Sequence, residues 1–262
     1  MSVILQTEQL TMKFGGLRAV DSVDMSIEEG TTHALIGPNG AGKTTLFNIV
    51  SGIYIPTEGR VTFKGIDLRR KKSHDIAAMG IGRTFQNILL FDDLPAWQNV
   101  MIGRHLKTNQ PLVESIFNTS RIKREEIRNR ERSLELLDYV GLSKQANASA
   151  GSLPYGKKRL LEIARALALE PSMLLLDEPA AGMNASESVE LVDIIDKIRK
   201  EGITILLVEH NMRVAMSVSD TVTVLNYGQK IAEGPPETIQ NNPAVIEAYL
   251  GKGGVKKNDT NA

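Results

Sequence analysis

Cysteine is absent from this chain of 262 residues, and net charge is absent too, because 31 Lys and Arg residues balance 31 Asp and Glu residues. The lack of cysteine excludes disulfides, thiolate catalysis and Cys-ligated zinc, and it fits a reducing compartment. The balanced charge provides no global basic field of the kind that attracts nucleic acid. We therefore expect no nucleic-acid partner.

Long apolar runs are missing as well. No apolar segment approaches about 18 residues, so the sequence predicts no membrane-spanning helix. The first residues, MSVILQTEQL, lack the basic stretch and the long apolar run of a signal peptide. We expect a chain that is cytosolic or peripheral to a membrane, with room for one large domain that carries an inserted subdomain.

The most informative segment that is present, residues 37–44, reads GPNGAGKT and has the spacing of a P-loop. Its glycines reach backbone angles that let successive N–H groups form an anion nest, and the following helix points its positive end at the same place. Lys43 supplies a full charge for the terminal phosphates, and Thr44 supplies a hydroxyl for Mg2+. A Gly-rich turn without a ligand is the alternative, and the surrounding strand-loop-helix pattern argues against it.

Hydrophobic periodicity predicts an α/β chain interrupted by a helical insertion. Strands are expected at residues 3–5, 20–27, 32–36, 60–64, 81–85, 173–176, 203–208, 221–225 and 229–232, and helices at 73–79, 121–140 and 186–200. The expected domain is residues 1–251. Its α/β core and β subdomain take residues 1–86 and 161–251, residues 87–160 form the helical insertion, and a polar tail, residues 252–262, is expected to be disordered. The charged helix at 121–140 fits a solvated face, with a lipid-facing surface as the alternative.

Two carboxylates end the apolar run of residues 173–179, which reads MLLLDEP. Ligands bind at the carboxyl ends of parallel strands, so Asp177 is placed to hold Mg2+ directly or through water. Glu178 is placed to take a proton from an attacking water. Two solvated acids in a strand-end turn are the alternative.

Three further features are weak alone. His210 ends the run ITILLVEH, where it is either a satisfied core histidine or a hydrogen-bond donor near the terminal phosphate. Gln86 lies where the helical insertion begins, and its amide can contact Mg2+ or the attacking water. The segment LPYGK, residues 153–157, precedes a helix with a wide apolar face, and an ordinary helix with a Pro-Gly entry turn is the alternative.

In this order and spacing, GPNGAGKTT, the Gln86 loop, LPYGK, LLLDEP and the Glu-His pair ending at His210 resemble the ATP-binding subunits of ABC transporters over about residues 3–250. The stretches KFGGLRAV, GIGRTFQ, LDEPAAGMN and NNPAVIEAYLG resemble the branched-chain amino acid (LIV-type) uptake subfamily most, although relatives that import other amino acids or amides are similar. The resemblance implies a RecA-like P-loop core with an N-terminal antiparallel β subdomain and an inserted helical subdomain.

The resemblance also implies residue roles. Phe14 stacks on adenine with Val20 beside it, unless Phe14 is a core strand residue. Glu178 is the catalytic base, His210 is the switch histidine, and Gln86 reports nucleotide state. The phosphate-loop contacts to ATP are Asn39, Gly40, Ala41, Gly42, Lys43, Thr44 and Thr45, and the Mg2+ contacts are Thr44, Gln86 and Asp177. The signature segment that contacts ATP held by the opposite subunit is Leu153, Pro154, Tyr155, Gly156 and Lys157.

The partners implied are transmembrane permease subunits, a second ATP-binding subunit (a paralogue or a second copy) in a nucleotide sandwich and, indirectly, an extracytoplasmic substrate-binding protein. The chain is then an ATPase that energises an amino-acid importer from the cytoplasmic face of the inner membrane. A soluble ABC-type ATPase with an assembly role is the alternative. A kinase or GTPase is disfavoured, because the chain lacks the Asn-Lys-x-Asp guanine motif.

The sequence departs from the usual Leu-Ser-Gly-Gly-Gln signature at Pro154, Tyr155 and Lys157, so the ATP site that this segment completes is expected to be slower or asymmetric. Asn184 stands where many relatives have Asp. Trp97 is expected either at a protein interface or in the core, two alternatives that the sequence leaves equally open.

Overall fold

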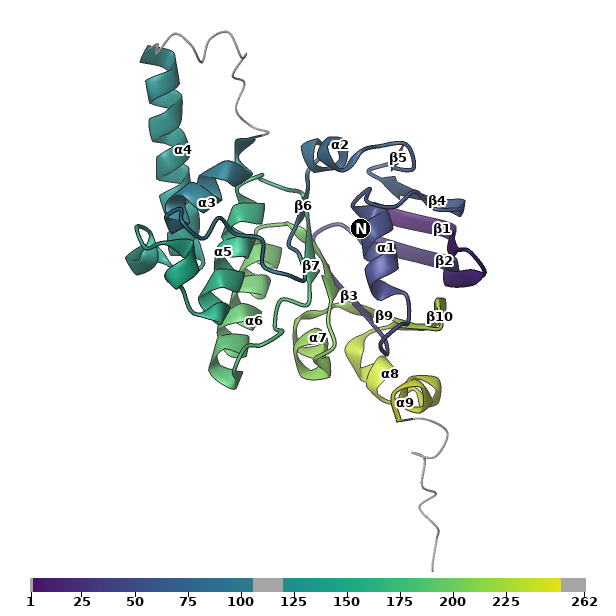
Figure 1. The fold of residues 1–262 in the computed structure, drawn as a ribbon. Helices are drawn as coiled ribbons and strands as arrows, with labels where there is room; N and C mark the ends of the chain where they lie inside the picture. Colours follow the sequence, from purple (N-terminus) through teal and green to yellow (C-terminus); the bar gives the residue numbers. More distant parts are fainter. Residues whose placement is uncertain (1, 106–119, 251–262) are drawn as a thin grey trace, which may run out of the picture. The chain divides into compact units, whose positions relative to one another are not determined.

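The computed structural model describes residues 2–105 and 120–250, and the chain forms two compact units that we describe one at a time (Figure 1). The first unit comprises Met1–Ile76 and Ile198–Ala262, and the second comprises Ala77–Lys197. The tail predicted at residues 252–262 and part of the predicted insertion, residues 106–119, lie outside the described residues.

An antiparallel sheet in the first unit has the strand order β2-β1-β4-β5. Its strands are β1 (Val3–Phe14), β2 (Leu17–Glu28), β4 (Glu58–Phe63) and β5 (Ile66–Asp67). β1 is far longer than the predicted strand at residues 3–5. The prediction failed because two residues of its buried face are polar: Thr7 and Thr11 are each 1% exposed. The Thr7 hydroxyl donates to the carbonyl of Val23 across 2.9 Å, so its burial leaves no hydrogen bond unmade.

Parallel strands form the centre of the first unit. There, β3 (Thr32–Ile36) pairs in parallel with both β8 (Thr204–Val208) and β9 (Thr221–Asn226), and β10 (Gln229–Gly234) pairs antiparallel with β9. Every residue of β3 and of β8 is buried, as expected for parallel strands covered on both faces. Tyr227 and Gly228 have φ angles of 46° and 80°, and they form a tight hairpin between β9 and β10.

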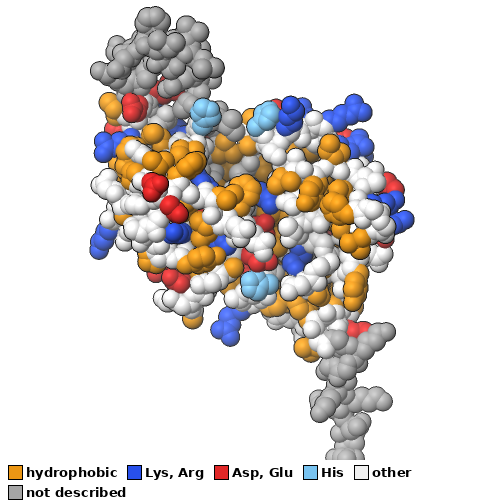
Figure 2. Space-filling view, viewed as in Figure 1, with side chains coloured by type: hydrophobic (Ala, Val, Ile, Leu, Met, Phe, Trp, Pro, Cys, Tyr) orange, Lys and Arg blue, Asp and Glu red, His pale blue; other side chains and the backbone are white. Residues whose placement is uncertain are grey.

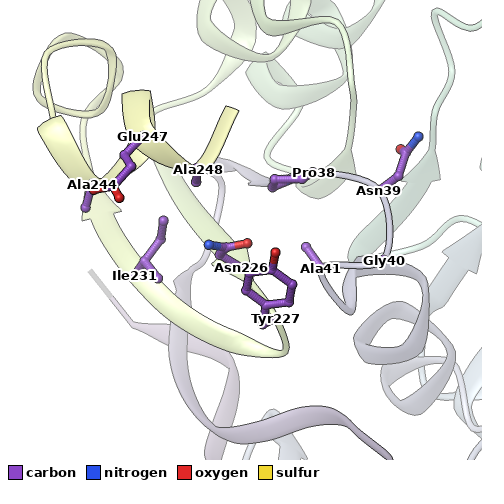
Figure 3. A pocket seen from close by; sticks show the side chains of 10 residues that line it. All are labelled: Pro38, Asn39, Gly40, Ala41, Asn226, Tyr227, Ile231, Ala244, Glu247 and Ala248. Atoms are coloured by element: carbon purple, nitrogen blue, oxygen red, sulfur yellow. The ribbon is translucent and has the colours of Figure 1, made fainter. Parts of the chain in front are cut away.

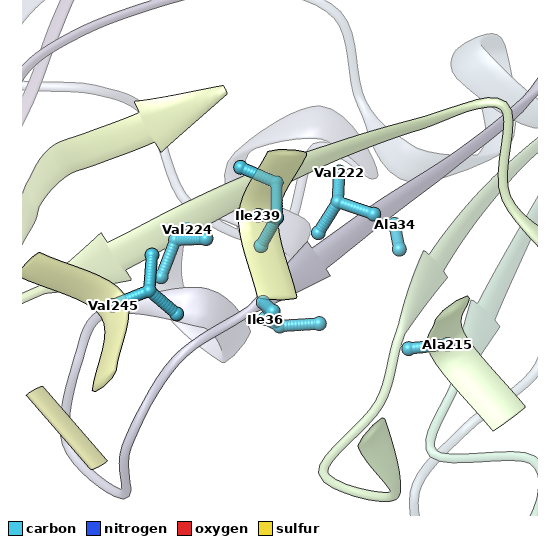
Figure 4. Close-up of a cluster of buried hydrophobic side chains, with 7 residues drawn as sticks. All are labelled: Ala34, Ile36, Ala215, Val222, Val224, Ile239 and Val245. Carbon is cyan, nitrogen blue, oxygen red and sulfur yellow. The ribbon is translucent and has the colours of Figure 1, made fainter. Parts of the chain in front are cut away.

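Short helices cover one face of β3 and β9 (Figure 4). The covering helices are α7 (Met212–Val218), α8 (Pro236–Gln240) and α9 (Pro243–Leu250), and they contribute Ala215, Ile239 and Val245 to a buried cluster. The strand side of that cluster consists of Ala34, Ile36, Val222 and Val224. Ile36 directly precedes the P-loop, so the packing of this cluster fixes where the loop begins.

The second unit pairs β6 (Ile81–Arg83) in parallel with β7 (Met173–Asp177). Its helices α3 (Ala96–Gly103), α4 (Ser120–Tyr139) and α5 (Tyr155–Leu167) contact one another, and α6 (Ala185–Lys200) follows β7 and runs to the boundary between the units. Gly141, at φ 75°, follows the end of α4, close to the predicted helix end at residue 140. β6 is shorter than the predicted strand at residues 81–85. The prediction was wrong at residues 84–85. There, Arg159 of α5 donates a hydrogen bond to the carbonyl of Phe85, and this carbonyl does not pair with a neighbouring strand.

The predicted α/β organisation with an antiparallel sheet and a helical segment is confirmed. The described part of residues 87–160 contains helices and turns, with one isolated β-bridge from Pro95 to Ser149. Trp97 was expected either at an exposed interface or in the core, and its side chain is in neither environment. The indole is half-buried, and the guanidinium of Arg130 lies 5.1 Å from its ring centre.

Candidate nucleotide-binding site

The P-loop passes so close to neighbouring backbone that Gly37 and Gly42 have no room for a side chain. A Cβ on Gly37 would lie 2.2 Å from the carbonyl oxygen of Leu225, and a Cβ on Gly42 would lie 2.2 Å from that of Ala19. Gly42 also has a φ of 103°, which residues with a Cβ rarely adopt. The loop is therefore held between the end of β9 and the start of β2.

Positive charge gathers where helix α1 (Lys43–Val50) begins. Its first turn holds no acidic residue to neutralise the helix dipole. The buried Lys43 ammonium donates to the carbonyls of Gly37, across 2.7 Å, and of Pro38, across 3.0 Å, so it lies against the loop. Thr44 is exposed and Thr45 half-buried at the same helix end. The geometry matches an anion site that offers backbone N–H groups, one ammonium and two hydroxyls.

A cavity of about 570 Å3 lies beside the loop (Figure 3). Residues of the P-loop, of the β9–β10 hairpin and of α9 form its walls: Pro38, Asn39, Gly40, Ala41, Asn226, Tyr227, Ile231, Ala244, Glu247 and Ala248. The charged residue among these is Glu247, and neither Lys43 nor Thr44 lines the cavity. The cavity is therefore distinct from the positive end of α1, and an acidic wall does not suit a phosphate.

The predicted adenine residues behave differently from each other. Phe14, at the end of β1, is 43% exposed and packs edge to face against Tyr54, with ring centres 5.4 Å apart. This exposure argues against a core role for Phe14. Val20 is 0% exposed, which contradicts a direct contact between its side chain and a base. The pairing of β2 with β1 shifts register between Val23 and Val20, so Val20 is buried like Val23 although the two lie an odd number of positions apart. Sequence reasoning missed Tyr54, since no periodic pattern marks it.

His210 follows β8 on the P-loop's side of the sheet. Leu35 of β3 is paired with Val208 of β8, so the P-loop and His210 leave the same edge of neighbouring parallel strands. The imidazole is exposed, so the core alternative does not hold. Its backbone is fixed, because the buried Glu209 carboxylate accepts from the N–H groups of His210 and Asn211.

Asp177 lies at the end of β7 in the second unit and is 2% exposed. Its carboxylate accepts from the Arg83 guanidinium across 3.4 Å, and its N–H donates to the hydroxyl of Thr84 across 3.2 Å. Burial raises the pKa of Asp177, and the positive charge of Arg83 opposes that rise. Two consecutive residues at the end of β6 thus hold both the backbone and the side chain of Asp177.

Glu178 has a φ of 48°, an unusual angle for a residue with a Cβ, and such strain is concentrated at functional sites. Its carboxylate is half-buried and accepts from the side-chain amide of Gln86 across 3.4 Å. The structure therefore brings together the two residues that the sequence predicted to act on an attacking water.

The predicted Mg2+ contacts are all oxygen donors: a hydroxyl of Thr44, an amide of Gln86 and a carboxylate of Asp177. This chemistry fits Mg2+, a hard cation. Within residues 2–105 and 120–250, no group of three or more His, Asp or Glu could hold a metal alone. A bound Mg2+ would therefore need ligands from water and from nucleotide phosphates, as is usual for this ion.

The segment 153–157 starts α5. Pro154 takes the position before the first helical residue, where its fixed φ is tolerated and no side-chain cap is made. The Tyr155 ring packs against Gly182, and its hydroxyl accepts from Arg159 across 3.0 Å. Lys157 donates to Glu190 across 3.1 Å. Tyr155 and Lys157 thus have defined partners within the second unit.

Asn184 caps the start of α6. Its side-chain oxygen accepts from the N–H of Glu187 across 3.0 Å, and the Glu187 carboxylate accepts from the N–H of Asn184 across 2.9 Å. This reciprocal pair is a capping box. An Asn accepts this hydrogen bond as well as an Asp does, which explains why the departure from Asp at this position keeps the local structure. Sequence reasoning missed this cap, although the spacing of Asn184 and Glu187 is a signal for it.

Comparisons with known proteins agree with this geometry. A family model described as ABC transporter matches residues 20–181, and one described as branched-chain amino acid ATP-binding cassette transporter matches residues 229–255. The high-affinity branched-chain amino acid transport ATP-binding protein BraF of Pseudomonas aeruginosa is 44% identical over 250 residues, which cover 95% of this chain and 98% of BraF.

Solved structures give the same result. The ADP conformation of MJ1267, an ATP-binding cassette of an ABC transporter, has a TM-score of 0.84 and 33% identity over 96% of this chain and 100% of that one. A dimeric post-hydrolysis state of the cassette MJ0796, bound to ADP and Pi, has a TM-score of 0.76 and 26% identity over 89% of this chain and 99% of that one. The predicted P-loop NTPase fold is confirmed, and the chain belongs to the ABC transporter family as one of its ATP-hydrolysing cassettes.

Proposed function

We propose that this cassette hydrolyses ATP with Mg2+ to energise the import of branched-chain amino acids. The observation that carries the proposal is the P-loop geometry, a buried Lys43 at the start of α1 in a loop that leaves no room for a Cβ at Gly37 or Gly42, within a chain 44% identical to BraF. The substrate class rests on the names of such relatives and on the model matched by residues 229–255.

Binding would use the first unit. The backbone N–H groups of residues 39–45 and the Lys43 ammonium would hold the phosphates, Thr44 would contribute its hydroxyl to Mg2+, and the exposed face of Phe14 would stack on adenine. Mg2+ would supply charge neutralisation on the phosphate oxygens. The edge-to-face contact with Tyr54 supports this role for Phe14, because it fixes the ring while leaving it exposed.

Hydrolysis would use a water activated by Glu178, which would take its proton. Gln86, whose amide contacts the Glu178 carboxylate, would orient that water, and Asp177 would hold Mg2+ directly or through water. His210 would donate a hydrogen bond from its imidazole to the terminal phosphate. The exposed imidazole and the fixed backbone of His210 support this role.

A second cassette would complete the site, as the dimeric MJ0796 cassette suggests. Residues 153–157 of each chain would contact ATP held by the other. The exposed start of α5 supports this proposal, since Tyr155 is 46% exposed there.

Transmembrane permeases would bind the second unit near Gln86. Hydrophobic side chains reach the surface among charged ones (Figure 2). In the segment that follows Gln86, Leu89 is 55% exposed and Phe91 is 52% exposed. The described residues contain no helix that is long and apolar enough to cross a bilayer. We therefore propose that the chain is peripheral at the cytoplasmic face of the inner membrane, held there by its permeases.

Purification of the tagged chain from membranes in mild detergent tests the proposal. We expect two polytopic proteins to co-purify, and we expect ATP-dependent leucine uptake when the complex is reconstituted with its extracytoplasmic binding protein. A Lys43→Ala complex serves as the control and should assemble without uptake. A set of exclusively soluble partners would contradict the proposal and favour an assembly role.

A further inference from the structure

The loop that carries Gln86 lacks the regular backbone hydrogen bonds of a helix or a strand. From Thr84 to Phe91 the chain is neither helix nor strand, and side chains of α5 hydrogen-bond the backbone of Phe85, Gln86 and Leu89. Arg159 donates to the carbonyls of Phe85, across 2.7 Å, and of Gln86, across 2.5 Å. At Leu89, the Glu162 carboxylate accepts from the N–H across 3.2 Å and Arg165 donates to the carbonyl. The position of Gln86 is therefore set by α5.

Arg159 makes two of these four contacts from a buried position, with 3% exposure. It also pairs with Glu162 across 3.1 Å, and Glu162 is 1% exposed. Burying a charged pair is costly unless its hydrogen bonds are made. Here both protons of Nη1 and both protons of Nη2 are used, so the fork of the guanidinium has a defined orientation. A lysine cannot reproduce this fork.

Arg159 also contacts the segment 153–157, through the nitrogen that donates to the Gln86 carbonyl. Nη2 donates to the Tyr155 hydroxyl across 3.0 Å as well as to the Gln86 carbonyl, and the guanidinium lies 5.4 Å from the centre of the Tyr155 ring. Tyr155 stands where the usual signature has a glycine, which has no side chain to make this contact. Tyr155, Arg159 and the Gln86 backbone thus form one continuous chain of contacts.

We propose that Arg159 is a positioning residue that ties Tyr155 to the Gln86 loop, so that a nucleotide contacting residues 153–157 repositions the Gln86 amide against Glu178. This inference rests on the proposed function, since it requires ATP from a second cassette at that segment. The tyrosine then acts as a sensor of the partner's nucleotide, and its presence in place of glycine is a functional substitution.

Tyr155→Phe is the sharpest test, because it removes the hydroxyl and keeps the ring against Gly182. We expect kcat for ATP hydrolysis to fall about three- to tenfold, the effect of one lost hydrogen bond to a charged group, with KM for ATP unchanged. Arg159→Lys should act in the same direction and more strongly. Tyr227→Phe removes the hydroxyl of an 87% exposed tyrosine and serves as the matched control.

Hydrogen exchange of residues 84–90 supplies the readout that a purely structural role would not move. In a Glu178→Gln background that stops turnover, we expect ATP to slow exchange in this loop, and we expect Tyr155→Phe to abolish that slowing while ATP still binds. Because Tyr155 is partly exposed, this variant should fold even if Arg159→Lys does not.

Two outcomes are distinguishable. If Tyr155→Phe keeps its kcat and still shows the ATP-dependent slowing, the inference is overturned while the proposed function stands. If the parent chain binds no ATP, the proposed function is overturned and the inference falls with it.

Discussion

The side-chain amide of Gln86 donates to the carboxylate of Glu178 across 3.4 Å, although the two residues lie 92 positions apart in the sequence. Gln86 follows β6 and Glu178 follows β7, and these strands pair in parallel, so both side chains leave the same edge. The neutral amide of Gln86 can orient the Glu178 carboxylate without neutralising its charge. This contact is the arrangement from which we expect a general base to act.

Glu178→Gln should lower ATP hydrolysis by about two to four orders of magnitude, because a glutamine cannot accept the proton of the attacking water. ATP should remain bound and hold the cassettes as a dimer. Phosphate release and size-exclusion chromatography with ATP measure the two effects. Glu201→Gln, at an exposed position after α6, is the control and should keep full turnover. Undiminished hydrolysis in Glu178→Gln would rule out this base.

Gly42→Ala should weaken nucleotide binding at least about tenfold. The new Cβ would lie 2.2 Å from the Ala19 carbonyl at a φ of 103°, so the loop must move and lose its anion geometry. Titration with a fluorescent ATP analogue measures the affinity. Gly16→Ala is the matched control, because a Cβ there has no neighbour within 4 Å and no positive φ to oppose it. Equal affinities in the two variants would contradict the tight fit of the P-loop.

Phe14→Ala should raise KM for ATP about tenfold with little change in kcat, since base stacking on an aromatic ring contributes about 1–3 kcal/mol. Phe14→Tyr should retain the parent KM. Steady-state ATPase assays distinguish the two. Leu17→Ala, at a 66% exposed position of the same hairpin, controls for damage to the strand end. A Phe14→Ala chain with the parent KM would exclude adenine stacking at this position.

Acid should destabilise the fold through His33. Burial lowers the pKa of His33 to about 4, and its ring nitrogen hydrogen-bonds the Thr223 hydroxyl across 2.8 Å. The unfolded chain binds the proton near the ordinary pKa of about 6.5. Stability is therefore complete above that value and is lost as the pH falls from about 6.5 to about 4.

The size of this effect follows from the same two pKa values. His33 alone should cost about 2 kcal/mol of unfolding free energy between about pH 7 and about pH 5. Urea denaturation at the two pH values measures it, and the loss should be smaller in His33→Gln, which cannot be protonated in this range. An identical pH dependence in both chains would show that the histidine is not the group responsible.

Local patterns predicted β3, β7 and β8 well, because these strands are short apolar runs whose identity depends on little beyond their own residues. The prediction of β1 was too short, since Thr7 and Thr11 are buried through partners on other strands. The motif predicts Val20 beside the base, whereas an irregular stretch in the pairing of β2 with β1 buries it. The face on which a strand residue lies depends on how that strand pairs with its neighbour, and the sequence of one strand does not show this pairing.

The sequence by itself determined the chemistry of this protein: a phosphate loop, two carboxylates after a buried strand, and an ATP-hydrolysing cassette of the ABC transporter family. Tertiary structure decided which of those groups touch. The contacts of Gln86 with Glu178, of Asp177 with Arg83 and of Arg159 with Tyr155 and the Gln86 backbone join segments brought together by parallel strand pairing and by the packing of α5. Such contacts leave no local periodicity in the sequence, because each depends on where the remainder of the unit places its partner.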